Sequence, residues 1–181
     1  MKKILVGSLV GGLLLFIWQT LSWMVFDLHA KAHSYTEKQD AILSTLNTEL
    51  TAEGSYVLPM PKPGTPMSEH ETFMKANEGK PWATIIYRKA FEVDMVMNIV
   101  RGFVVNIILM ALFCWILSKI AIPKFGTIFM ASLFAGLIVF LNGIYTGHIW
   151  YPMFDLMAHL TDAIAGWGLA GLWLGWWYSK K

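Results

Sequence analysis

Four long apolar stretches alternate with polar segments and dominate the pattern of the chain. They cover residues 1–26, 93–120, 125–147 and 151–178, and each is long enough for the roughly 20 residues that a helix needs to cross a bilayer. The first stretch is also longer than the apolar region of a signal peptide, roughly 7–15 residues, so we expect it to be retained. The pattern predicts an all-α membrane protein, a bundle of four transmembrane helices.

Residues 27–92 form the only extended polar region and separate the first predicted span from the second. Helical periodicity near 41–50 and near 68–77 predicts two short helices, with four prolines between them. Residues 84–87 are β-branched or aromatic and can pair with residues 56–58 as a two-stranded ribbon. A segment of this size cannot hold a large core alone, so we expect a small cap on the membrane part.

The distribution of lysines predicts how the helices are oriented. Only 14% of residues are charged, whereas a soluble domain has about a quarter. By the positive-inside rule, the termini and the link between the second and third spans are cytoplasmic, because they carry Lys2, Lys3, Lys119, Lys124, Lys180 and Lys181. Residues 27–92 are then extracytoplasmic.

The last apolar stretch carries Asp155, His159 and Asp162, which share one helical face because their spacing is i, i+4 and i+7. Charged groups at membrane depth normally face protein or water, so other polar groups should stand opposite. We predict an intramembrane polar layer in the outer half of the bundle, made of Gln19, Asn98, Arg101, Asn142, Asp155, His159 and Asp162.

Two interpretations of this layer stay open. In the structural one, Arg101 neutralises Asp155 or Asp162 and fixes the register of the bundle. In the functional one, the layer binds a proton, an ion or an anionic headgroup.

The sequence indicates no cofactor. His29 and His33 have the i, i+4 spacing of metal ligands, and Asp27, His70 or His148 can join them, but histidines beside a membrane are usually interfacial. Haem would need axial ligands at matching depth, and only His159 is embedded. There is also no Ser-His-Asp set, phosphate loop, dinucleotide fingerprint or basic patch for nucleic acid. We therefore expect no metal site and no nucleic-acid partner.

Small residues suggest close contacts between helices. These surfaces consist of Gly7, Gly11, Gly168, Gly171 and Gly175. Together with the missing catalytic set, they favour a non-enzymatic role as an accessory or stabilising component of a larger membrane complex or of a homo-oligomer. The alternative is a small transporter or membrane enzyme that uses the polar layer.

The chain resembles a group of small bacterial inner-membrane proteins with four spans. The resemblance is carried by five pieces: residues 2–25, 54–59, 80–87 and 101–103, and the ending from Tyr151 through Asp162 and Gly166 to Leu172. It implies a bacterial inner membrane and the four-span layout. These motifs indicate no particular activity.

Overall fold

The computed structural model describes residues 1–121 and 124–180, so the predicted turn at Pro123 and the charge of Lys181 lie outside the described residues. The chain divides into two compact units. One unit contains Met1–Ser34 and the helices that follow Asp94, and the other is Tyr35–Val93. Residues 27–34, which the sequence analysis assigned to the cap, thus belong with the long helices.

The first unit is built from long helices. They are α1 (Lys2–Thr20) with its π-helical continuation η1 (Leu21–Val25), α4 (Met95–Leu117), α5 (Phe125–Val139) with η2 (Phe140–Tyr145) and α6 (Thr146–Trp150), and α7 (Leu156–Ser179). In the described part of the chain, three helices are long and apolar enough to cross a membrane: Lys2–Val25, Met95–Leu117 and Phe125–Trp150. Helix α7 is of similar length, but His159, Asp162 and its glycines make it less apolar.

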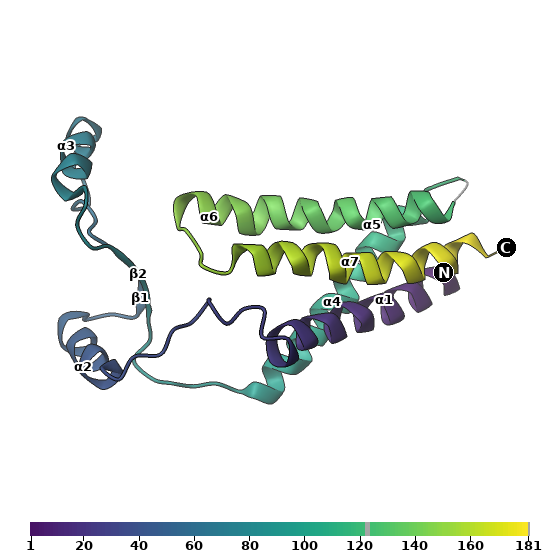
Figure 1. The fold of residues 1–181 in the computed structure, drawn as a ribbon, viewed down its shortest axis with the longest axis horizontal. Coiled ribbons are helices and arrows are strands. Elements are labelled where there is room, and N and C mark those ends of the chain that lie inside the picture. Colours follow the sequence, from purple (N-terminus) through teal and green to yellow (C-terminus); the bar gives the residue numbers. More distant parts are fainter. Residues whose placement is uncertain (122–123, 181) are drawn as a thin grey trace. The chain divides into compact units, whose positions relative to one another are not determined.

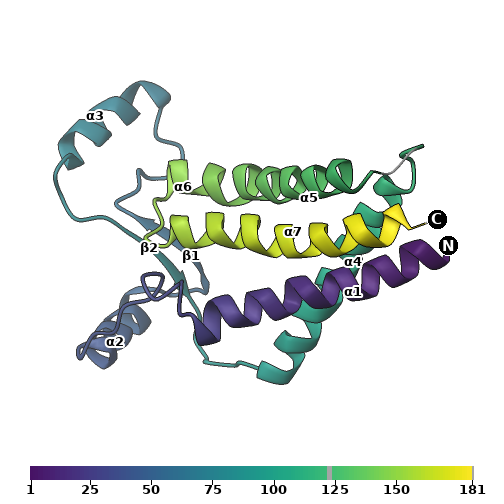
Figure 2. The same ribbon diagram turned by 45° about the vertical axis from the view of Figure 1, so that its right-hand side comes forward.

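These helices lie side by side in the order α4, α1, α7, α5, because α1 packs against α4 and α7, and α7 packs against α5. Figures 1 and 2 show the start of α1 and the end of α7 together at one end. Lys3 Nζ donates a hydrogen bond of 2.7 Å to the Lys180 carbonyl there. The end of α1 and the start of α7 meet at the opposite end, which we call the His29 end.

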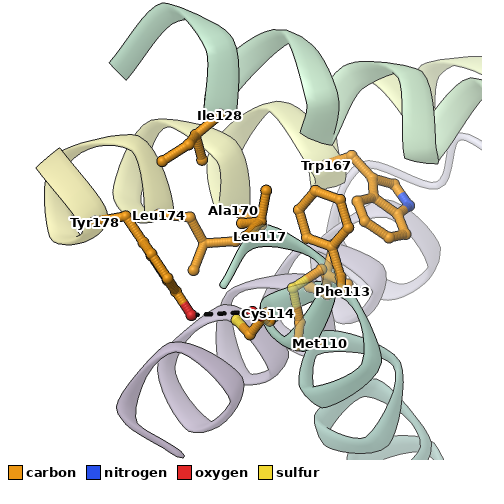
Figure 3. Close-up of a cluster of buried hydrophobic side chains, with 10 residues drawn as sticks. Met110, Phe113, Cys114, Leu117, Ile128, Trp167, Ala170, Leu174 and Tyr178 are labelled. Atoms are coloured by element: carbon orange, nitrogen blue, oxygen red, sulfur yellow. Dashed lines mark hydrogen bonds between the residues drawn. The ribbon is translucent and has the colours of Figure 1, made fainter. Parts of the chain in front are cut away.

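Apolar side chains of α1, α4, α5 and α7 form one core (Figure 3). Met110, Cys114 and Leu174 have no exposed surface, and Tyr178 donates a hydrogen bond of 3.3 Å to the Cys114 carbonyl. The rings of Phe113 and Trp167 meet edge to face, with centroids 5.4 Å apart. Side chains of α4 and α7 therefore meet in this core, although α1 lies between the two helices.

The predicted small-residue surfaces contact other helices of the same chain. A Cβ added at Gly7 would lie 2.8 Å from Cys114 Sγ, and one at Gly11 would lie 3.0 Å from Met110 Sδ. Added Cβ atoms at Gly171 and Gly175 would meet α5 at 2.7 and 2.8 Å, and one at Gly168 would lie 3.7 Å from a leucine of α5. Glycine therefore permits the close contacts of α1 with α4 and of α7 with α5.

The second unit contains α2 (Gln39–Glu49), β1 (Gly54–Leu58), α3 (Met67–Asn77) and β2 (Ala83–Tyr87). The strands pair antiparallel, with Tyr56 opposite Ile85. The two short helices and the ribbon expected from the sequence are thus present. Tyr87, 5% exposed, donates a hydrogen bond of 2.8 Å to Asn47 Oδ1, which ties the ribbon to α2.

Candidate functional site

A tight turn after α1 brings a histidine back onto the helices. The π-helical segment η1 ends the helix, and Asp27 follows in the left-handed backbone region with φ of 48°. Aspartate tolerates this conformation better than most residues. The Leu28 amide then donates a hydrogen bond of 3.0 Å to the Ser22 carbonyl, which closes the turn. His29, two residues beyond Asp27, is consequently only 3% exposed.

His29 bridges two carboxylates of the last helix. Its Nδ1 lies 2.7 Å from Asp155 Oδ2, and its Nε2 lies 3.0 Å from Asp162 Oδ2. Asp155 is the N-cap residue of α7 and Asp162 lies two turns further along, so both point from one face of that helix. We call the group His29, Asp155, His159 and Asp162 the His29 site.

This geometry determines how many protons the site holds. An ionised carboxylate only accepts hydrogen bonds, so an imidazole between two of them must donate from both nitrogens and carry a positive charge. Burial favours the neutral imidazole, but the hydrogen bonds from Asp155 and Asp162 and their negative charges outweigh it, so the pKa of His29 is raised above its usual 6.5. Even when His29 is positively charged, the two carboxylates outnumber it, so the three groups together keep a net negative charge.

The remaining contacts hold these four groups in place. His159 Nε2 lies 3.3 Å from Asp155 Oδ2, and its ring meets the His29 ring edge to face at 4.6 Å between centroids. Trp18 Nε1 donates a hydrogen bond of 3.0 Å to Asp162 Oδ1. The Trp23 ring stacks on His29 at 3.9 Å, with 1° between the ring planes. The imidazole of His29 therefore has little freedom to rotate.

A cavity of about 430 Å³ adjoins the His29 site. His159, Asp162 and other residues of α7 line one part of it, and α1, η1, α4, α5 and η2 supply the remaining lining. Asn106, 4% exposed, donates a hydrogen bond of 2.7 Å to Gln19 Oε1 at the α1–α4 side. The cavity is thus mainly apolar and aromatic with a few polar groups, which is typical of small-ligand sites.

The structure brings part of the predicted polar layer together. Asp155, His159 and Asp162 meet at the His29 site, and Gln19 lines the adjoining cavity. The three others, Asn98, Arg101 and Asn142, are exposed.

The ion pair expected for Arg101 is not formed. Among the described residues, Arg101 makes no salt bridge, and His29 takes its place between Asp155 and Asp162. An arginine has a long side chain that can reach water, whereas the short His29 side chain is carried to α7 by the turn at Asp27.

Sequence reasoning also missed the partner of His29. It paired His29 with His33, but His33 is exposed. It also left out Asn106 and Trp18 as polar partners of Gln19 and Asp162. The sequence did contain one indication of this partner. The acidic face with Asp155 and Asp162 needs a cation close to it, and His29 follows the first span at the same end of the bundle.

The His29 site is chemically suited to holding a proton or a metal ion. Imidazole nitrogens and carboxylate oxygens are both ligands of divalent metals, and one such ligand atom each from His29, Asp155 and His159 lie within 4.8 Å of one another. Compared with known proteins, the chain matches no family model, no curated protein and no solved structure.

Proposed function

We propose that this chain is a four-span protein of the bacterial inner membrane that binds a cation at the His29 site and works as a small transporter. One observation carries the proposal: Asp155 and Asp162 converge on a single buried imidazole beside a cavity. Ionisable groups at membrane depth are costly and mark ion or proton pathways by default.

The sign of the charge favours a cation over an anionic headgroup. Asp155 and Asp162 supply two negative charges, and His29 supplies one positive charge. Arg101, the residue expected to attract a phosphate, forms no salt bridge to this site among the described residues. A headgroup phosphate would therefore meet net negative charge, whereas a cation would relieve it.

A working site is also supported by the backbone around the cavity. The π-helical segments η1 and η2 both contribute to the lining, through Trp23 and through Phe140 and Ile144. Single π-helical turns are rare and are found frequently at functional sites. A purely structural ion pair requires neither these interruptions nor a cavity.

Helix α7 is the fourth span in this proposal. Its 24 residues extend about 36 Å, enough for a hydrocarbon core of about 30 Å. It packs between α1 and α5, both parts of span candidates, which supports a position at their depth. Lys2, Lys3 and Lys180 gather at the end opposite to the His29 end, which favours cytoplasmic termini and an outward-facing His29 site.

Charge movement in reconstituted membranes tests the proposal. Proteoliposomes on a solid support are given concentration jumps of H⁺, Na⁺, K⁺, Mg²⁺ or Zn²⁺, one cation at a time. We expect at least one cation to produce a transient current with the wild type, reduced strongly in Asp162→Asn. The matched control, Asp40→Asn, changes an exposed aspartate of α2 and should leave the current unchanged. No current with any of these cations, or an equal current in Asp162→Asn, would reject the proposal.

A second candidate function is that of an accessory component in a complex or homo-oligomer. It is favoured by exposed apolar side chains in the second unit, where Met67 is 81%, Ile86 77% and Phe91 94% exposed. These residues lie outside the span candidates, so lipid tails do not explain them. Mild detergent extraction and native mass determination test this role. A monomer without a co-purifying protein would count against it.

A further inference from the structure

The His29 site has the ligands of a transition-metal centre. His29 Nδ1 and His159 Nε2 both face Asp155 Oδ2, at 2.7 and 3.3 Å. Two imidazoles and one carboxylate form a ligand set that binds divalent zinc, iron and related metals, usually with a further position open.

The second layer of contacts points to the same chemistry. Metal-bound histidines almost always donate their other ring N–H to a carboxylate or carbonyl, which fixes the tautomer and the ring orientation. If Nδ1 of His29 binds the metal, its Nε2 donates to Asp162 Oδ2 at 3.0 Å. Trp18 Nε1 in turn donates a hydrogen bond of 3.0 Å to the other carboxylate oxygen of Asp162, Oδ1. Asp162 is therefore placed as an orienting residue rather than as a ligand.

Charge balance selects a divalent ion. With both histidines neutral, Asp155 and Asp162 carry two negative charges, which one divalent cation neutralises. A neutral centre is favourable where the side chains are as buried as those of His29 and Asp155, 1% and 6% exposed. Na⁺ or K⁺ would leave one charge uncompensated.

We propose that His29, Asp155 and His159 bind a divalent transition-metal ion such as Zn²⁺, with Asp162 orienting His29 and the adjoining cavity giving access to an open coordination position. This inference rests on the proposed function and specifies which cation the His29 site binds. Ligand atoms around a tetrahedral zinc are separated by about 3.3 Å, because zinc–ligand bonds are about 2.0–2.1 Å. The Asp155–His159 separation of 3.3 Å already fits, and the Asp155–His29 separation of 2.7 Å must widen as the metal replaces the shared proton.

Cobalt substitution tests the site on the purified full-length chain. The protein in detergent is stripped with a chelator, dialysed and titrated with CoCl₂, and the visible absorption of bound Co²⁺ is followed. We expect one Co²⁺ per chain, displaced by Zn²⁺. His29→Ala and His159→Ala should each abolish the visible band. Asp162→Asn, which keeps the ligands, should weaken binding about 10–100-fold.

The matched control is His33→Ala, which removes an exposed histidine four residues from His29 and should leave binding unchanged. Size-exclusion chromatography and circular dichroism confirm that each variant is folded; if His29→Ala does not fold, His159→Ala decides. An absent band in the wild type, or a band lost in His33→Ala and kept in His159→Ala, would overturn the inference. Currents with H⁺ or Na⁺ but no Co²⁺ binding would reject the metal and leave the proposed function standing.

Discussion

Replacing His29 with alanine should destabilise the chain more than any other change to its histidines. The side chains of His29, Asp155 and Asp162 are 1%, 6% and 18% exposed, so water cannot fully replace the imidazolium. Breaking a buried ion pair by removing one partner costs about 3–5 kcal/mol. Asp155 keeps His159 at 3.3 Å and Asp162 keeps Trp18 at 3.0 Å, so we expect the lower end, about 3 kcal/mol.

For a chain of this size, about 1 kcal/mol shifts the melting temperature by about 2–4 °C. His29→Ala should therefore melt about 6–12 °C lower than the wild type, in metal-free detergent solution followed by tryptophan fluorescence. His33→Ala is the matched control and should melt with the wild type. Adding Asp155→Asn to His29→Ala should recover part of the loss, because an orphaned carboxylate is removed. The reasoning is refuted if His29→Ala melts within about 1 °C of the control, far below the shift expected for a buried pair.

Three further predictions concern pH, helix contacts and the turn. The pKa of His29 is raised in the folded chain, so protonated His29 should stabilise the fold fully below about pH 6.5. This contribution to stability should be lost as the pH rises through the raised pKa. The difference in melting temperature between wild type and His29→Gln should therefore shrink in alkaline, metal-free buffer. Gly136→Ala places a Cβ 2.5 Å from the Ala163 carbonyl oxygen and should cost at least about 1–3 kcal/mol in denaturation, whereas Gly126→Ala, with nothing within 4 Å, should be neutral. Asp27→Val should cost about 1–3 kcal/mol because its φ is 48°, and Asp27→Gly should cost clearly less in the same melting assay.

The long helices and the small-residue contacts could be predicted from the sequence, because both depend on local patterns. Apolar runs of about 20 residues identify span candidates. Glycines at four-residue spacing, as at Gly7 and Gly11, indicate close helix contact. The sequence did not specify which helix these glycines contact, and in the structure that helix is α4.

The candidate site could be predicted only in part. The helical spacing of Asp155, His159 and Asp162 placed them on one face, and this needs no tertiary information. The partner of that face depends on the backbone path after α1, which a single left-handed residue, Asp27, redirects. The predicted polar layer placed Arg101 near the aspartates, but the sequence could not determine toward which side of α4 it points. His29 was assigned to a polar segment, and its burial followed from tertiary structure alone.

The central claim is that His29 is a doubly hydrogen-bonded cation between Asp155 and Asp162 in the metal-free chain. Nitrogen-15 NMR of histidine-labelled protein in nanodiscs tests it directly, and His29→Gln assigns the signal. At a pH just below its usual pKa of 6.5, His29 should show protons on both ring nitrogens with slow exchange into D₂O. If the imidazole of His29 is neutral there and its ring protons exchange rapidly, the account is contradicted.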